Sequence, residues 1–134
     1  MRRITYQELE EGCRELAAKI LNGSTIKYES IYAVPRGGVP IALMLNQHLK
    51  LKWVDNEQQI DSKTLIVDDI SDTGRTLKRF TNNHTATFHL KPASECKPTW
   101  CVEETDDWIE YPYEQTDRDE EDNIVRMLET LGED

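Results

Sequence analysis

Residues Thr64 to Leu77 read TLIVDDISDTGRTL. Apolar and β-branched residues over 64–67 predict a buried strand, and an acidic, hydroxyl-rich loop with one glycine follows it. The stretch 73–80 then predicts a helix. Loop N–H groups, hydroxyls and the positive end of a helix dipole all favour a phosphate. Because two adjacent carboxylates in front of the loop suit the hydroxyls of a sugar, the run predicts a site for a sugar phosphate.

Strands and helices alternate on both sides of this run. The expected strands cover 30–34, 51–54, 64–67, 85–90 and 100–102, and the expected helices cover 5–23, 41–49, 73–80 and a last segment from 116 or 117. A capping box formed by Thr5 and Glu8 starts the first helix. Apolar side chains recur along it at helical spacing and are expected to face inward: Leu9, Cys13, Leu16, Ala17 and Ile20. The alternation predicts an α/β fold with a mainly parallel sheet flanked by helices. Ligands bind such sheets at the carboxyl ends of the strands, where the turns after Val34 and Val67 both fall.

The composition is that of a folded, water-soluble protein. The chain has 134 residues, of which 37% are hydrophobic and 31% charged, and it contains no apolar stretch of membrane-spanning length. Its three cysteines, Cys13, Cys96 and Cys101, lack the spacing of a zinc site and predict reduced thiols. No apolar run follows the basic N-terminus, so we expect no signal peptide, no membrane partner and a cytoplasmic location.

Negative charge is concentrated in the last quarter of the chain. The net charge is −10, and residues 103–134 hold fourteen acids against two bases, whereas residues 1–102 hold twelve acids against fourteen bases. So acidic a protein is not expected to bind nucleic acid. The acidic end is expected to be a solvated face that aids solubility.

The acidic and hydroxyl residues between positions 68 and 76 are compatible with more than one function. Asp68 and Asp69 should point to opposite faces of a strand, and two such carboxylates suit ribose hydroxyls or Mg²⁺. The triplet Asp72-Thr73-Gly74 also occurs in aspartic proteases, but there it lies in an all-β fold, whereas 75–80 predicts a helix here. A helix capped by Asp72 alone would leave the preceding acids without a role.

Every position from Leu65 to Thr76 fits one known pattern: an apolar strand, two acids, an apolar residue, any residue, and then Asp-Thr-Gly-any-Thr. The run resembles the motif with which type I phosphoribosyltransferases bind 5-phosphoribosyl-1-pyrophosphate (PRPP). The resemblance spans most of residues 28–114 and implies the single-domain α/β fold of that family. Because some relatives keep the motif only as regulators, it implies binding of this sugar phosphate more directly than catalysis.

A turn rich in proline and glycine follows the first sheet strand, where residues 34–40 read VPRGGVP. The pair Gly37-Gly38 by itself is equally compatible with an ordinary turn. The segment resembles the pyrophosphate loop of the 6-oxopurine branch of the family, which implies that Arg36 and Gly37 bind pyrophosphate. The likeness also implies a strained peptide between Pro35 and Arg36 that can be cis, with backbone N–H groups facing the pyrophosphate.

Two further segments resemble the xanthine–guanine and archaeal hypoxanthine–guanine enzymes: Lys91-Pro92 and residues 108–114, WIEYPYE. The likeness implies that Lys91 donates to the exocyclic oxygen at purine C6, that Trp108 stacks on the ring and that the Ile109 carbonyl reads the position-2 substituent. An ammonium group penalises an amino group at C6, so adenine should be rejected. The alternative for Trp108 is a packed core aromatic.

The implied reaction displaces pyrophosphate from ribose C1 by a purine nitrogen, through a transition state that resembles an oxocarbenium ion. Asp72 is the expected catalytic residue, which hydrogen-bonds or deprotonates the purine at N7. Mg²⁺, expected at Asp68 and Asp69, and the Arg36 turn would neutralise the pyrophosphate. The residues expected to bind PRPP are Asp68, Asp69, Ser71, Asp72, Thr73, Gly74, Arg75 and Thr76.

One departure from the family concerns the lid. Relatives carry a long flexible loop between the pyrophosphate loop and the acidic pair, and it closes over the reaction. Here Asp68 lies only 32 positions after Arg36, and a helix and a strand leave only the polar stretch 55–63 for a lid. A shorter cover, a neighbouring subunit or the acidic tail would have to exclude water, or catalysis is weak.

Three functions follow from these observations. The first is a purine salvage phosphoribosyltransferase acting on guanine, xanthine or hypoxanthine. The second is a regulatory protein of the same fold that binds PRPP or a nucleotide with little turnover; the short lid favours it, and the intact Asp72, Lys91 and Trp108 oppose it. The third is an enzyme on another acceptor such as a pyrimidine, which Lys91 and the Trp108–Ile109 pair oppose.

The expected organisation is one domain over 1–134. It comprises an α/β core with the PRPP site over 1–90, a small purine-binding segment over 91–114 and an acidic helix over 115–134. A homodimer or a larger homo-oligomer is expected.

Overall fold

The structure is a computed structural model that describes residues 1–114, so the expected acidic helix over 115–134 lies outside the described residues. Contacts within the chain define two compact units. The larger unit is Leu9–Asp106, and the smaller one joins Met1–Glu8 to the stretch that begins at Asp107. No helix within the described residues is long and apolar enough to cross a membrane.

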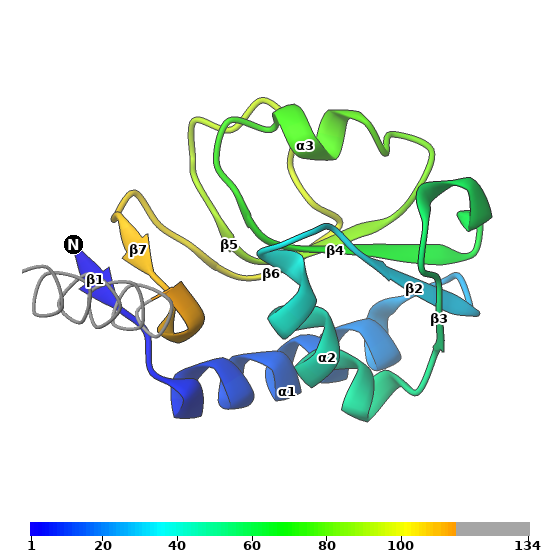
Figure 1. The fold of residues 1–134 in the computed structure, drawn as a ribbon, viewed down its shortest axis with the longest axis horizontal. Helices are drawn as coiled ribbons and strands as arrows, with labels where there is room; N and C mark the ends of the chain where they lie inside the picture. Colours follow the sequence, from blue (N-terminus) through cyan, green and yellow to red (C-terminus); the bar gives the residue numbers. More distant parts are fainter. Residues whose placement is uncertain (115–134) are drawn as a thin grey trace, which may run out of the picture. The chain divides into compact units, whose positions relative to one another are not determined.

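The larger unit is built on a five-stranded sheet in the order β3-β2-β4-β5-β6, and every neighbouring pair is parallel (Figure 1). The strands are β2 (Ser30–Ala33), β3 (Lys52–Trp53), β4 (Thr64–Ser71), β5 (Thr85–Leu90) and β6 (Trp100–Glu104). The central strands β4 and β5 are buried along most or all of their length, as strands covered on both faces must be. The predicted α/β fold with a parallel sheet is confirmed.

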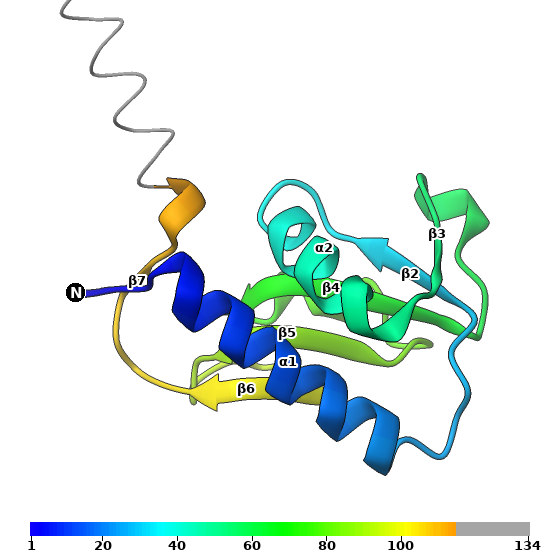
Figure 2. The ribbon, with the colours of Figure 1, turned by 90° about the horizontal axis from the view of Figure 1, so that it is seen from below.

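Helices cover both faces of this sheet. In Figures 1 and 2, α1 (Tyr6–Gly23) and α2 (Gly38–Leu49) lie against one face, and the short α3 (Arg75–Lys78) lies over the other. The close approach of α1 requires a glycine, because a Cβ at Gly12 would overlap the ring of Phe88 on β5. The connection between β3 and β4 contains a 3₁₀ turn, η1 (Glu57–Gln59).

The predicted start and buried stripe of α1 are confirmed. The Glu8 N–H donates to Thr5 Oγ1 at 3.1 Å, and the Thr5 N–H donates back to Glu8 Oε1 at 3.4 Å, which is a capping box. Leu9, Cys13, Leu16, Ala17 and Ile20 are the predicted inward positions, and all are buried. Burial raises the pKa of the Cys13 thiol to about 12, so this cysteine packs as an apolar side chain.

The opposite face of the sheet has its own apolar cluster. Tyr32, Val34, Val54, Ile66 and Phe80 pack together there, and the partly buried Ile60 packs against them. Phe80 follows α3 and Ile66 lies on β4, so the cluster holds the α3 segment against the sheet. This packing fixes the chain on both sides of residues 71–76.

Several predicted boundaries are wrong; β6, for example, ends at Glu104 and not at residue 102, and three other errors affect the site. β4 continues past Val67 to Ser71, because β5 pairs with it along this length, as far as the pair of Ser71 with Leu90. The two aspartates therefore lie on a strand instead of in a loop. The helix expected over 73–80 is only α3, since Gly74 has a positive φ of 92° that no α-helix contains. α2 begins at Gly38, three residues earlier than the apolar pattern indicated.

The smaller unit contains a two-stranded parallel pair that the sequence did not predict. β1 (Arg2–Arg3) pairs with β7 (Ile109–Glu110), and the Arg3 side chain donates to the buried Glu110 carboxylate at 3.2 Å. Two residues are too few to show an alternating pattern, so such strands escape sequence reasoning.

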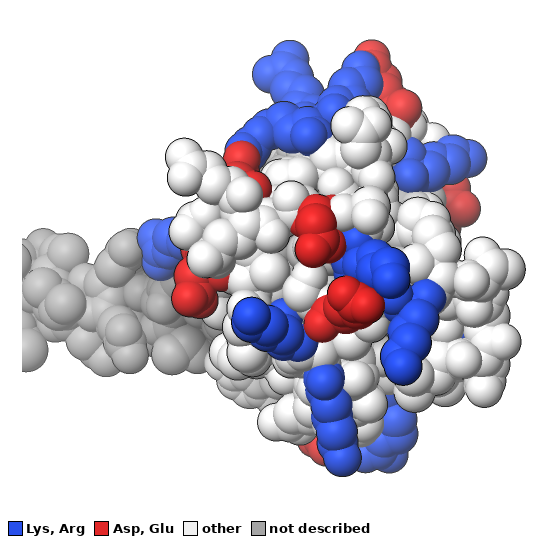
Figure 3. Space-filling view, turned by 90° about the vertical axis from the view of Figure 1, so that its right-hand side faces the viewer, with Lys and Arg blue, Asp and Glu red and all other residues white. Residues whose placement is uncertain are grey.

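Charged side chains of both signs lie side by side on the face of the larger unit that carries β3 (Figure 3). Lys63 lies 3.3 Å from Glu29, and Arg79 pairs with Glu57. Exposed pairs of this kind contribute at most about 1 kcal/mol each. They leave the face electrically mixed instead of uniformly basic.

Candidate functional site

The predicted sugar-phosphate site is a hollow at the carboxyl end of β4. It has a volume of about 230 Å³ and is lined by the continuous run from Asp68 to Leu77. All eight residues predicted to bind PRPP lie in that run. The carboxyl end of a central parallel strand is where ligands bind in α/β sheets, and the structure brings the predicted residues together there.

Residues 71–76, named here the Gly74 loop, have the geometry of an anion cradle. Asp72 and Thr73 are exposed, and among the described residues the N–H groups of Asp72, Thr73 and Gly74 have no hydrogen-bond acceptor. The Thr73 hydroxyl accepts from the Arg75 N–H at 3.2 Å, which closes the loop. Successive unpaired N–H groups around a left-handed residue bind anions. Because α3 has only four residues, the loop contributes more than the helix dipole.

The two adjacent aspartates face opposite sides of β4, as strand alternation predicts. Asp68 shares its side with Ile66, which packs in the cluster with Phe80. Asp69 lies on the side of α2, where a Cβ at Gly37 would overlap its carboxylate. Each carboxylate is held locally: Asp68 Oδ1 accepts from the Asp69 N–H, and Asp69 Oδ1 from the Ile70 N–H, both at 2.8 Å.

Asp68 is the electrostatically unusual member of the pair. Its residue is only 8% exposed, whereas Asp69 is half-buried. Burial raises the pKa of Asp68 to about 8, and the nearby charge of Asp69 contributes in the same direction. Asp68 is therefore largely protonated near neutral pH and can donate a hydrogen bond as well as accept one.

The predicted pyrophosphate turn lies beside the acidic pair. Its Pro35–Arg36 peptide is cis, as the resemblance allowed. The Val34 N–H donates to the Val67 carbonyl at 2.8 Å, so the end of β2 is joined to β4 directly before the aspartates. Gly38 is required at this approach, because a Cβ there would lie 3.0 Å from the Cα of Asp68 and closer still to the Val67 carbonyl oxygen.

The predicted purine-binding residues lie in different units. Lys91 follows β5 in the larger unit, and its Nζ donates to the Asp106 carbonyl oxygen at 3.0 Å. Trp108 and Ile109 belong to the smaller unit. Trp108 is 69% exposed, so its alternative reading as a packed core aromatic is wrong. The roles of all three residues toward a purine stay predictions.

The stretch 55–63, which remained for a lid, is held by hydrogen bonds. Asn56 caps η1 by accepting from the Gln58 N–H at 3.0 Å, and Glu57 pairs with Arg79. The Asn83 side chain donates to the Asp61 carbonyl oxygen at 2.8 Å. The segment is therefore anchored to the chain that follows α3.

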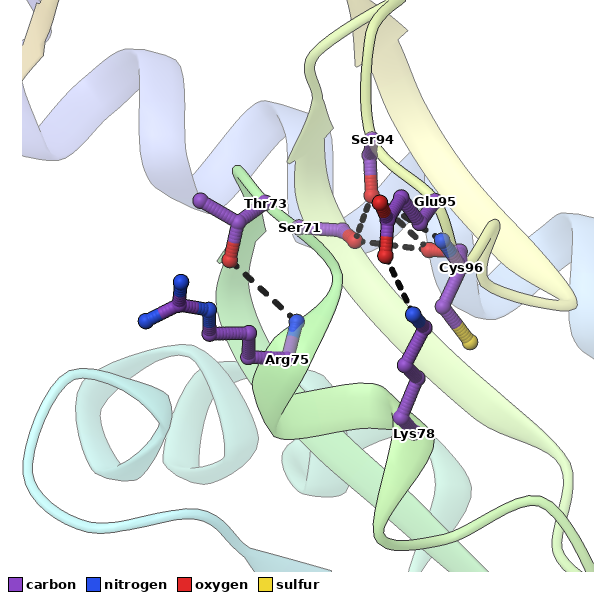
Figure 4. Close-up of polar contacts among 7 residues, drawn as sticks. All are labelled: Ser71, Thr73, Arg75, Lys78, Ser94, Glu95 and Cys96. Atoms are coloured by element: carbon purple, nitrogen blue, oxygen red, sulfur yellow. Dashed lines mark hydrogen bonds and ion pairs between the residues drawn. The ribbon is translucent and has the colours of Figure 1, made fainter.

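Sequence reasoning missed three residues that contact the Gly74 loop. Ser94, Glu95 and Cys96 bond to Ser71, Thr73 and Lys78 (Figure 4). The Ser71 hydroxyl is buried and bonds to Ser94 and Cys96, so its side chain faces these residues. No local pattern marks such contacts, because the two segments lie more than twenty positions apart.

Comparisons with solved structures agree on the fold. The xanthine–guanine–hypoxanthine phosphoribosyltransferase of Helicobacter pylori superimposes with a TM-score of 0.75 at 16% identity, over 90% of this chain and 97% of that one. The chain has the type I phosphoribosyltransferase fold. A hypothetical protein from Neisseria gonorrhoeae with bound ppGpp shares this phosphoribosyltransferase-like architecture, with a TM-score of 0.69 and 24% identity over 94% of this chain and 97% of that one.

Sequence comparison finds the same group of proteins. The xanthine-guanine phosphoribosyltransferase of Idiomarina loihiensis is 28% identical over 139 residues, which cover 83% of this chain and 85% of that protein. No protein-family model matches the chain. The resemblance to type I phosphoribosyltransferases that the motif indicated is confirmed.

Proposed function

We propose that this protein is a purine phosphoribosyltransferase that converts a 6-oxopurine base and PRPP into the nucleoside 5′-monophosphate and pyrophosphate. One observation carries the proposal: the Pro35–Gly38 turn, the acidic pair and the Gly74 loop meet at one end of the sheet. PRPP has a pyrophosphate, a ribose and a 5-phosphate, and the three features match these parts in that order. The names of the Idiomarina and Helicobacter relatives support the purine class.

The roles of the acidic pair differ in the proposal because their environments differ. Asp68 is buried and largely protonated, which suits a hydrogen bond with a ribose hydroxyl. Asp69 is half-buried beside the Gly37 turn, which suits a cation shared with the pyrophosphate.

Magnesium fits this arrangement only together with the substrate. Within residues 1–114 no three His, Cys, Asp or Glu side chains form a metal-ligand cluster. Mg²⁺ ordinarily binds one or two carboxylates, substrate phosphates and water, which is the donor set that Asp69 and PRPP would supply. Asp68 would join this set only by releasing its proton to solvent, since a bound cation favours the carboxylate form. When bound, the ion would neutralise charge on the departing pyrophosphate.

The transfer itself needs positioning and the removal of one proton. As the purine N9–C1 bond forms, the C1–oxygen bond to pyrophosphate breaks, and the proton on N7 leaves the base. Asp72 is exposed in the Gly74 loop and is the proposed acceptor of that proton. Lys91 is the proposed donor to the oxygen at C6, and Trp108 and Ile109 remain the proposed ring and position-2 contacts.

Incubation of the full chain with PRPP, Mg²⁺ and one base at a time tests the proposal. Guanine, xanthine and hypoxanthine are the expected substrates, and adenine and uracil are the matched bases that should fail. Formation of a nucleotide from uracil, with none from the 6-oxopurines, would show a different acceptor class. Absence of turnover with every base would remove the enzyme proposal.

A second candidate function is regulatory binding of PRPP or a nucleotide. It is favoured by the anchored 55–63 segment, which leaves little chain to close over a reaction, and by the ppGpp bound to the Neisseria protein of similar fold. Tight binding of PRPP or a guanine nucleotide, without turnover in the assay above, is the outcome that would select this function.

A further inference from the structure

A strap of chain, residues 91–96, leaves β5 and folds back onto the Gly74 loop (Figure 4). Its backbone is bonded to the loop at both ends. The Lys91 N–H donates to the Ser71 carbonyl at 3.0 Å, and the Glu95 N–H donates to the Thr73 carbonyl at 3.0 Å. The strap is closed on itself by the Ser94 N–H, which donates to the Lys91 carbonyl at 3.0 Å.

The side chains between these ends form a ring of hydrogen bonds. The Cys96 N–H reaches Ser94 Oγ at 3.4 Å, Ser94 Oγ lies 2.8 Å from Ser71 Oγ, and Ser71 Oγ donates to the Cys96 carbonyl at 2.8 Å. Ser94 Oγ also lies 3.1 Å from the Cys96 carbonyl oxygen. Each serine can therefore donate either to the other serine or to Cys96, and in each arrangement the Cys96 carbonyl accepts from one of them. Ser94 and Ser71 are 8% and 2% exposed, so the ring is shielded from water and its bonds reinforce one another.

The strap also packs closely against the loop at Gly74. A Cβ at Gly74 would lie 2.5 Å from the Cys96 nitrogen and 3.0 Å from Ser94 Oγ. On the exposed side, Glu95 pairs with Lys78 of α3. A displacement of the Gly74 loop must therefore move the strap as well.

We propose that Ser94 is a positioning residue, which couples the order of the Gly74 loop to the position of Lys91. Lys91 is the first residue of the strap, and the strap is hydrogen-bonded to the Gly74 loop at both of its ends. An anion that orders the loop therefore also orders Lys91. The first ligand to bind orders both the loop and the strap, so the second ligand loses less conformational entropy when it binds. Binding of the two ligands is therefore cooperative. This inference rests on the proposed function, in which the loop binds the 5-phosphate and Lys91 the base.

Calorimetric titration of hypoxanthine, with and without saturating ribose 5-phosphate, measures the coupling. Ribose 5-phosphate has no pyrophosphate to displace, so no reaction intervenes. In the wild-type chain we expect ribose 5-phosphate to lower the Kd of hypoxanthine about fivefold or more. In Ser94→Ala this ratio should fall toward one. If Ser94 had a purely structural role, its loss would weaken the binding of both ligands and leave the ratio of the two hypoxanthine Kd values unchanged. An unchanged ratio in folded Ser94→Ala would therefore overturn the proposal.

Ser24→Ala is the matched control. The Ser24 hydroxyl also donates to a backbone carbonyl, that of Ile26 at 2.7 Å, but it lies just after α1 and away from the Gly74 loop. The variant removes the same group and should keep the wild-type ratio. A loss of coupling in Ser24→Ala as large as in Ser94→Ala would also contradict the role given to Ser94.

Hydrogen exchange tests the coupling in the wild-type chain alone, so the result does not depend on whether a variant folds. Ribose 5-phosphate alone should slow amide exchange in residues 71–76 and also in 91–97. Slowing confined to 71–76 would overturn the coupling. If the wild-type chain binds both ligands independently, only this inference fails, whereas binding of neither ligand would remove the proposed function as well.

Discussion

Asp68→Asn should make the ligand-free protein more stable, and the gain should grow as the pH rises. Burial raises the pKa of Asp68 to about 8, whereas an aspartate in an unfolded chain titrates near 3.9. Between these two values the native state keeps a proton that the unfolded state has released. Stability from this group is therefore complete below about pH 4 and is lost as the pH rises toward about 8.

The size of the effect on stability follows from the one proton that the native state binds and the unfolded state does not. While Asp68 is protonated only in the native state, the free energy of unfolding falls by about 1.4 kcal/mol per pH unit. Asparagine has nearly the same shape and does not titrate, so this slope disappears in Asp68→Asn. From pH 5 to pH 7 the stability difference between variant and wild type should increase by about 3 kcal/mol.

Urea denaturation followed by tryptophan fluorescence, at pH 5, 6 and 7 in metal-free buffer, measures that difference. Groups that do not interact with Asp68 titrate alike in both proteins, so their contributions cancel. Asp72→Asn is the control, because this carboxylate is exposed on the Gly74 loop, and its stability should follow that of the wild type at each pH. A difference between Asp68→Asn and wild type that stays constant from pH 5 to pH 7 would refute the buried-carboxyl account.

Three further substitutions test the site. Gly74→Ala should cost about 2 kcal/mol of stability and abolish ribose 5-phosphate binding, since φ is 92° and the new Cβ would lie 2.5 Å from the Cys96 nitrogen; wild-type binding by this variant would contradict the cradle. Asp72→Asn should lower kcat far more than PRPP affinity, and equal losses would make Asp72 a binding residue only. Lys91→Met should raise the KM for hypoxanthine at least tenfold, about 1.4 kcal/mol, and reduce the preference over adenine; an unchanged preference would exclude Lys91 from base recognition.

The parallel core was predictable because its signals are local. β5 has the predicted bounds, and the capping box and buried stripe of α1 were read from residue spacing alone. The place of the Gly74 loop was also predictable, because the motif puts a glycine where the chain has a positive φ. Phosphate binding by this loop stays a prediction.

The errors arose where tertiary partners override local preference. Consecutive aspartates are unusual in a strand, yet β4 runs through Asp68 and Asp69 because β5 supplies the hydrogen bonds. β1 and β7 are more than one hundred positions apart, so no sequence window contains both strands of this pair.

The strap escaped prediction for the same reason. Ser94 and Cys96 look like ordinary loop residues in the sequence, and their role depends on contacts with Ser71 more than twenty positions earlier. The raised pKa of Asp68 likewise depends on how deeply the fold buries it, which a sequence does not state.

The most direct test of the central claim is the balance of one reaction. With PRPP, Mg²⁺ and a 6-oxopurine, pyrophosphate and nucleoside 5′-monophosphate should appear in equal amounts, and omission of the base should stop the release of pyrophosphate. Bound PRPP that is never converted, or pyrophosphate released without a base, would contradict the assignment of this protein as a purine phosphoribosyltransferase.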